Sequence, residues 1–201
     1  MIKKFCSVTF LLMSILITNG QNKWILKKDK DGIKVFTKNV DTSKFKAIKV
    51  ECVLDGTIGK FDSIIRNVEN HKSWVYSTKK SFLVKVVNKT EIIYYTETSL
   101  PWPASNRDVI IQMQILKDSV NNSETINASN LNGVINEKSG IVRVRLLSMQ
   151  YYVHLVSEHK ISITFNILVD PSGSIPAWIV NAFAVKGPFE TFSKLGDFLK
   201  Q

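Results

Sequence analysis

The chain of 201 residues is 44% hydrophobic and 22% charged, a composition that supports a packed core and excludes a disordered chain. Lysine and arginine outnumber aspartate and glutamate by 27 to 17, so the formal net charge is +10. The excess could favour anionic membranes or nucleic acid, but the basic residues are scattered and form no nucleic-acid-binding motif. We therefore expect one domain with a generally basic surface and no nucleic-acid partner.

Residues 1–20 have the pattern of a secretory signal peptide. Lys3 and Lys4 precede an uncharged, mostly apolar run over residues 5–18. This run is too short to span a membrane. We therefore expect export to the periplasm or out of the cell, and one continuous domain over residues 21–201.

Removal of the leader would leave Cys52 as the single cysteine, which excludes an intrachain disulfide. Cys52 lies in an alternating run in which it shares a face with Val50 and Leu54. This position favours a buried, inert thiol over a nucleophile.

The predicted elements after the leader run in the order strands, helix, strands, helix. Alternation indicates strands at residues 33–37 and 45–54, and a helical pattern follows at residues 57–70, with Thr57 or Asp55 as its cap. Further strands are predicted at residues 81–87, 91–99, 107–116, 141–147, 151–157 and 161–169. Residues 117–130 are the longest polar, turn-rich connection. This order favours an α+β fold with an antiparallel sheet over an alternating parallel one.

Residues 175–185 read IPAWIVNAFAV, in which Asn181 is the single polar side chain. A helix that is apolar on all sides does not lie on an ordinary surface, and this one is too short to span a bilayer. It is therefore either a core helix or one wall of a site for an apolar ligand. Ser174 can cap this helix, and Gly187 with Pro188 should interrupt or kink it.

Arg107 is the most informative charge in the chain. Alternation places it on the same face as Ile111 and Met113. A buried arginine needs a carboxylate or a polar ligand group as its partner. Glu91 and Glu97, on one face of the preceding predicted strand, are the nearest candidates in sequence. The alternative is a structural ion pair or a strand-end arginine that reaches solvent.

A set of short motifs in fixed order gives a family resemblance. The motifs are Trp24, Gly32-Ile33-Lys34-Val35, Trp74, Pro101-Trp102-Pro103, Asn106-Arg107-Asp108, and the run from Asp170 to Pro176 with Trp178 and Asn181. Together they resemble the START family, the steroidogenic-acute-regulatory-related lipid transfer domains, over residues 24–199. The resemblance implies a helix-grip fold, in which a curved antiparallel sheet wraps a long C-terminal helix around an internal hydrophobic tunnel for one lipid or sterol-like molecule.

The resemblance also implies a set of ligand-binding residues. Arg107 matches an arginine that often lies inside the tunnel of family members, paired with an acid from the neighbouring strand. The expected set is Arg107, Glu91, Glu97, Tyr95, Ile111, Met113, Trp178, Asn181 and Phe183. Asn181 would either contact the ligand or tie the helix to the sheet, and residues 117–125 would help to gate the tunnel. The chain departs from many family members in its expected export and in having no second domain.

Three functions fit these patterns. The first, which we favour, is a monomeric, non-enzymatic carrier of a lipid, with transient membrane contact and without cofactor or metal. The second is an enzyme like the cyclases or hydrolases of the wider helix-grip superfamily, but His71, His154 and His159 belong to no catalytic motif. The third is a surface binder that inserts Trp102 and Trp178 into a membrane or partner.

Overall fold

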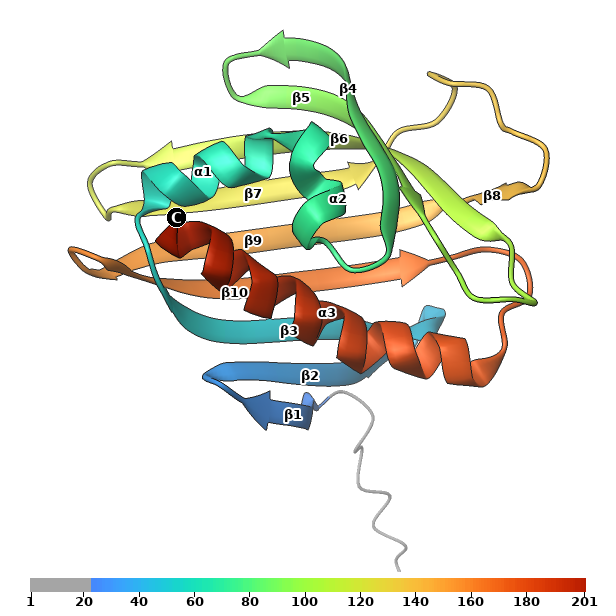
Figure 1. Cartoon of the computed structure of the whole chain (residues 1–201), viewed down its shortest axis with the longest axis horizontal. Coiled ribbons are helices and arrows are strands. Elements are labelled where there is room, and N and C mark those ends of the chain that lie inside the picture. The colour runs from blue at the N-terminus through green and yellow to red at the C-terminus, as the bar shows by residue number, and fades with distance from the viewer. Residues whose placement is uncertain (1–22) are drawn as a thin grey trace, which may run out of the picture.

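The computed structural model describes residues 23–201, and the predicted leader lies outside this part of the chain. A curved sheet faces a long C-terminal helix (Figure 1). The strands are β1 (Ile25–Lys30), β2 (Ile33–Val40), β3 (Ser43–Asp55), β4 (Thr78–Asn88), β5 (Glu91–Thr98), β6 (Asn106–Asp118), β7 (Ser123–Asn130), β8 (Ile141–Arg143), β9 (Leu146–Ser157) and β10 (Lys160–Asp170). The helices are α1 (Ile58–Arg66), α2 (His71–Trp74) and α3 (Ala177–Lys200), with a 3₁₀ turn at Val68–Asn70. The predicted α+β helix-grip fold is confirmed.

The sheet is antiparallel along its main path, in the order β1-β2-β3-β10-β9-β7-β6-β5-β4. The short β8 adds a parallel pairing with β6. Helix α3 lies across one face of the sheet, and α1 and α2 lie on the same side (Figure 1). The other face carries no helix among residues 23–201. The two faces of the sheet therefore have different surroundings.

Alternation along β6 decides which side chains face the helices. Ile111 and Met113 are buried in the main core, which also includes residues of α1 and α3. Ile110 points to the opposite face, where it packs with Ile93 and Tyr95 in a small second cluster. The predicted inward face of β6 is confirmed.

Helix α3 is continuous over its 24 residues, so Gly187 and Pro188 do not interrupt it, while the predicted alternative of a kink stays a prediction. Pro188 lies inside the helix, and the neighbouring Gly187 is buried against Tyr76. A Cβ at position 187 would lie 3.0 Å from Tyr76 Cδ1, so the glycine permits a close approach of helix and side chain. The predicted cap is also wrong, because Pro176 occupies the N-cap position and Ser174 does not.

Helix α1 begins where the sequence predicts. The backbone N–H of Lys60 donates a hydrogen bond to Thr57 Oγ1 at 3.2 Å, so Thr57 is the cap. The predicted helix over residues 57–70 is shorter than expected, because Asn67 leaves the helical conformation with a ψ of 70°. The 3₁₀ turn and α2 then carry the chain to Trp74, which is buried in the core.

Strand β7 lies inside the polar segment, residues 117–130, that the sequence predicts as a connection. Its inward side includes Glu124, which is fully buried and has no hydrogen-bond partner for either carboxyl oxygen within residues 23–201. Lys117 Nζ lies 3.9 Å from Glu124 Oε2, while Lys117 and Arg66 both donate to Asp62. Burial, reinforced by the charge of Asp62, raises the pKa of Glu124 from 4.5 to about 7.

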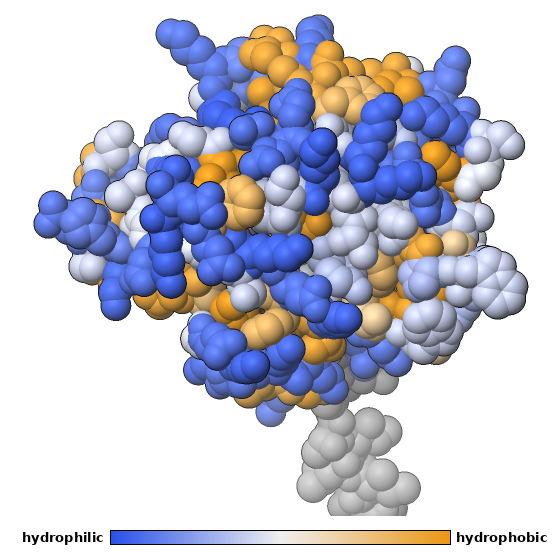
Figure 2. Space-filling view, in the orientation of Figure 1, coloured by the Kyte–Doolittle hydropathy of each residue, from blue (hydrophilic) through white to orange (hydrophobic). Residues whose placement is uncertain are grey.

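Other strand boundaries also differ from the sequence prediction. Strand β1 was not predicted, and residues 141–147 and 151–157 form the short β8 and one long β9. The edge strand β4 exposes several apolar side chains, and apolar surface gathers at the top of the space-filling view, where β4 and β5 lie (Figure 2). Lysines along the same strand discourage pairing with another chain at this edge.

Candidate functional site

A cavity of about 400 Å³ lies between the sheet and α3. Its walls come from β3, β4, β5, β6, β9, β10, α1, α2 and α3. Most of the lining is apolar, including Ile111, Met113, Phe165, Ile179 and Phe183. A hydrophobic molecule in this cavity would exchange water for apolar contacts on most of its surface.

His71 is the one histidine in the lining. Its Nε2 donates to the carbonyl oxygen of Ile65 at 2.9 Å, and its ring makes edge contacts with Trp74 and Tyr94. Burial lowers the pKa of His71 to about 4, although the bond to Ile65 and the charge of Glu69 act in the opposite direction. The imidazole is therefore neutral at pH 7.

Arg107 is the one buried cation in the lining, with 5% of the residue exposed. Its guanidinium donates to the carbonyl oxygens of Ser105 at 2.6 Å, Pro171 at 3.2 Å and Ser172 at 3.0 Å, with a longer contact to Ser174 at 3.5 Å. No carboxylate in residues 23–201 forms an ion pair with it. Burial lowers the pKa of Arg107. Carbonyl dipoles alone therefore balance its charge.

The predicted pairing of Arg107 with Glu91 or Glu97 is wrong. Arg107 lies opposite Thr98 in the β5–β6 register, so the adjacent Glu97 points to the other face of the sheet. Glu97 accepts hydrogen bonds from Asn106 Nδ2 at 2.8 Å and Lys79 Nζ at 3.0 Å. Glu91 accepts one from Gln112 on the outer face.

The buried ion pair of this region is instead formed by Asp108 and Arg143. Arg143 Nε lies 2.6 Å from Asp108 Oδ1, and its Nη2 lies 3.1 Å from Oδ2. The Asp108 side chain is 1% exposed and the Arg143 side chain is 4% exposed. Arg143 also donates to the carbonyl oxygen of Ile135 at 3.0 Å, which holds the segment after β7 against the outer face of the sheet.

The structure brings five of the predicted residues into the cavity lining. These are Arg107, Ile111, Met113, Asn181 and Phe183. Asn181 makes no hydrogen bond to the sheet within residues 23–201, so it lines the cavity without tying the helix down.

Four predicted residues lie elsewhere, and so does the predicted gate. Glu91 and Glu97 are on the outer face, as described above. Tyr95 also faces outward and stacks on Phe82 at 4.8 Å, so its neighbour Tyr94 lines the cavity in its place. Trp178 is 56% exposed and does not line the cavity. Residues 117–125 form the β6–β7 hairpin, and none of them lines the cavity.

Sequence reasoning missed the contribution of α2 and of the later strands. His71, Trp74 and Tyr151 all line the cavity. Strand alternation could have placed Tyr151 on the inner face, since it shares a side with Val153 in the same predicted strand. A pattern search could not have placed His71 and Trp74, because their short helix is positioned by tertiary packing.

The sheet, the long helix and the apolar cavity between them define a helix-grip protein with an internal site. A model of the START domain family matches residues 13–201. The chain belongs to the START domain family.

Known proteins are similar over most of the chain. A STAR-related lipid transfer protein from Xanthomonas axonopodis has a solved structure with a TM-score of 0.80 and 28% identity, over 89% of this chain and 99% of that one. An uncharacterized protein of Pseudomonas aeruginosa is 27% identical over 86% of this chain and 84% of its own length. The phosphatidylcholine transfer protein of Mus musculus is 23% identical over 82% of this chain and 78% of its own length.

Proposed function

We propose that the protein binds one lipid-like molecule in the cavity between the sheet and α3 and carries it without a chemical step. The observation that carries this proposal is the buried, mainly apolar lining of a 400 Å³ space. Membership of the START domain family supports it, as does the similarity to proteins named for lipid transfer. Burial of about 300 Å² of apolar ligand surface at roughly 25 cal/mol per Å² would contribute about 7 kcal/mol before ordering costs.

The size of the cavity narrows the ligand class. Its 400 Å³ lies near the lower end of the range of about 300–1,000 Å³ that is usual for small-molecule sites. This volume favours a compact lipid or one with a single acyl chain over a bulky lipid with two long chains.

Arg107 supports a polar or anionic group at one end of that ligand. An arginine has five N–H donors, and its four recorded carbonyl contacts leave one N–H on Nη1 free within residues 23–201. Its charge has no carboxylate partner there, so a carboxylate or phosphate on the ligand would gain a charge-assisted hydrogen bond. We infer that the ligand's head group lies at the Arg107 end of the cavity.

Two exposed tryptophans support membrane contact at the same end. Trp102 is 89% exposed on the loop between β5 and β6, and Trp178 is 56% exposed in the first turn of α3. Arg107 bonds to carbonyl groups of both the 99–105 loop and the segment that leads into α3. Tryptophan suits the interface between lipid and water. We infer that these two segments contact the membrane and separate when the ligand passes.

A chemical step has less support. His71 is neutral, buried and already bonded to a carbonyl group, so it is a poor general base. No group of three or more potential metal ligands occurs among residues 23–201.

No helix in this part of the chain is long and apolar enough to cross a membrane. We propose an exported protein, periplasmic or secreted, on the pattern of residues 1–20 alone.

The ligand proposal is tested by mass spectrometry of lipids extracted from protein purified from its own host, followed by binding of a matched fatty acid and fatty alcohol. Ala184 lines the cavity and Ala182, on the same helix, does not. Ala184→Trp should weaken binding strongly by occupying part of the cavity, and Ala182→Trp should retain it. The fatty acid should bind more tightly than the alcohol, and Arg107→Gln should remove that preference. The absence of any bound or loadable lipid would refute the proposal.

The membrane proposal is tested by flotation with vesicles of phosphatidylcholine and phosphatidylglycerol. Trp102→Ala should weaken vesicle binding about tenfold, because a large apolar side chain no longer enters the interface. Val120, which is 90% exposed on the β6–β7 turn, provides the matched control. Equal binding by wild type, Trp102→Ala and Val120→Ala would refute docking through Trp102.

A further inference from the structure

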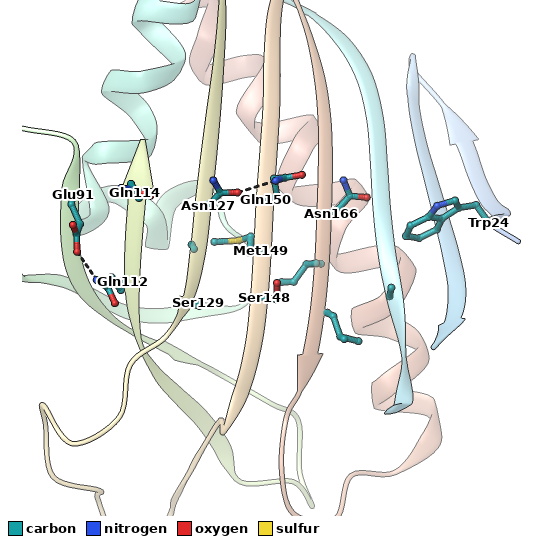
Figure 3. A pocket seen from close by; sticks show the side chains of 14 residues that line it. Trp24, Glu91, Gln112, Gln114, Asn127, Ser129, Ser148, Met149, Gln150 and Asn166 are labelled. Carbon is teal, nitrogen blue, oxygen red and sulfur yellow. Dashed lines mark hydrogen bonds between the residues drawn. The ribbon is translucent and has the colours of Figure 1, made fainter. Parts of the chain in front are cut away.

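A second hollow, which we call the outer trough, lies on the face of the sheet opposite α3 (Figure 3). Its volume is about 620 Å³, and 14 residues line it. Met149 and Ile167 belong to the linings of both the trough and the inner cavity, so a single layer of sheet separates the two spaces. The side chains that characterise the trough are Trp24, Gln112, Gln114, Asn127, Gln150 and Asn166.

Strand register places most of these side chains in one row. Glu91 lies opposite Gln114, Gln114 opposite Asn127, Asn127 opposite Gln150, and Gln150 opposite Asn166. Directly paired residues point to the same face of a sheet, so the row crosses five strands on the outer face. From Glu91 to Asn166 it covers four strand spacings, or about 19 Å. We call it the amide row.

A second row runs beside the amide row. Gln112 lies opposite Ser129, Ser129 opposite Ser148, and Ser148 opposite Leu168. All four residues also line the trough. The floor of the trough therefore presents amide groups along the first row. The second row presents one amide, two hydroxyl groups and the apolar side chain of Leu168.

Most of this polar surface is available to a ligand. Gln150 Nε2 donates to Asn127 Oδ1 at 2.8 Å, and Gln112 donates to Glu91 (Figure 3). The side chains of Gln114 and Asn166 have no hydrogen-bond partner in residues 23–201. Each primary amide carries two N–H donors and an oxygen acceptor. The row can therefore donate and accept hydrogen bonds from Gln114 to Asn166, whereas the carboxylate of Glu91 at its β5 end only accepts them.

The composition of the trough excludes several ligand classes. No lysine or arginine lines the floor of the trough, Lys38 and Lys49 lie only at its Trp24 end, and Glu91 lines the other end, so the trough offers no continuous cationic surface to an anionic polymer. The central strands are already paired on both sides, so a peptide cannot join as an added strand. An apolar ligand would leave the amides without partners.

Trp24 adds an aromatic surface at the β1–β3 end of the trough (Figure 3). The ammonium groups of Lys38 and Lys49 lie 5.0 and 5.4 Å from its ring centroid and help to fix its position. Because these ammonium groups lie over the ring, a sugar unit would place its apolar C–H groups against the part of the indole that lines the trough. An extended molecule with many hydroxyl groups and no charge matches both features.

We propose that the outer trough binds a neutral oligosaccharide, with its hydroxyl groups on the amide row and one sugar ring against Trp24. The site is independent of the lipid proposal, because it lies on the opposite face and shares only the sheet with the inner cavity. Its length favours an oligomer of several units over a monosaccharide.

The test is an NMR titration of the ¹⁵N-labelled protein with cellotetraose, maltotetraose, mannotetraose and chitotetraose at millimolar concentration, and with the matching monosaccharides. At least one tetraose should shift the side-chain amide signals of the amide row and the indole signal of Trp24. Its monosaccharide should bind at least tenfold more weakly. Trp24→Ala should weaken tetraose binding about two- to tenfold. Gln114→Ala should also weaken binding, because it removes a free amide at the second of the five positions of the row.

Tyr152→Ala is the matched control, since Tyr152 lies on the same strand and face as Gln150 but outside the trough. This variant should bind the tetraose as the wild type does. The proposal is overturned if no tetraose shifts the trough signals, or if the shifts persist unchanged in Trp24→Ala and Gln114→Ala. It is also overturned if the trough signals depend on protein concentration and not on sugar, a result that would identify the trough as a contact between two copies of the chain.

Discussion

Removal of Arg143 should destabilise the protein strongly, because Asp108 would become an unpaired buried charge. The wild-type pair has two contacts of 2.6 and 3.1 Å, and its side chains are 4% and 1% exposed. Loss of one partner of such a pair costs about 3–5 kcal/mol. Because a domain is stable by only about 5–15 kcal/mol, Arg143→Met should lower the urea midpoint substantially.

The double variant Arg143→Met/Asp108→Asn separates lost charge pairing from lost packing. It removes the stranded charge, so it should be at least about 1 kcal/mol more stable than Arg143→Met alone. It should not regain wild-type stability, because the bond from Arg143 to the Ile135 carbonyl is also lost. Arg145 provides the control, since its ion pair with Glu137 is more than half exposed, and Arg145→Met should cost less than about 1 kcal/mol. Equal midpoints for Arg143→Met and Arg145→Met would refute the reasoning.

Three further predictions concern buried groups. Glu124 has a pKa of about 7 in the folded protein and 4.5 in the unfolded chain, so the stability should fall as the pH rises between these values. Glu124→Gln should make the urea midpoint less dependent on pH across this range. Parallel pH profiles would contradict this. NMR titration should show that His71 stays neutral until its pKa of about 4, and a midpoint near 6.5 would disagree. Gly187→Ala should lower the free energy of unfolding by about 1–3 kcal/mol, because the added Cβ would press on Tyr76. Gly59→Ala, on α1 where the space is open, should raise it by up to about 1 kcal/mol. Thermal melts that rank the two variants oppositely would refute the packing argument.

The sequence patterns predicted the fold class and the inward face of β6 correctly. Arg107, Ile111 and Met113 reach the cavity because alternation along a buried strand has one consistent solution. The predicted inward face was wrong for β5, where Tyr94 rather than Tyr95 lines the cavity. Strand β5 is buried on both faces near these tyrosines, so its apolar pattern does not distinguish inside from outside.

Two other failures have different physical causes. Strand β7 looked like a loop because its outward side is polar and its inward side includes the buried Glu124, so few apolar residues mark it. The partners of Arg107 could not be predicted, because they are backbone carbonyl groups of residues distant in sequence, such as Pro171 and Ser172. Carbonyl partners leave no trace in side-chain patterns.

The single layer of sheet between the cavity and the outer trough also constrains how this sequence can vary. Along β6, Ile111 and Met113 line one space while Gln112 and Gln114 line the other. A substitution can therefore alter one site and spare its neighbour. A one-residue insertion or deletion within β6 would instead move the amides into the apolar cavity and the apolar side chains into the trough. We expect related chains to vary more freely in the residues of this strand than in its length.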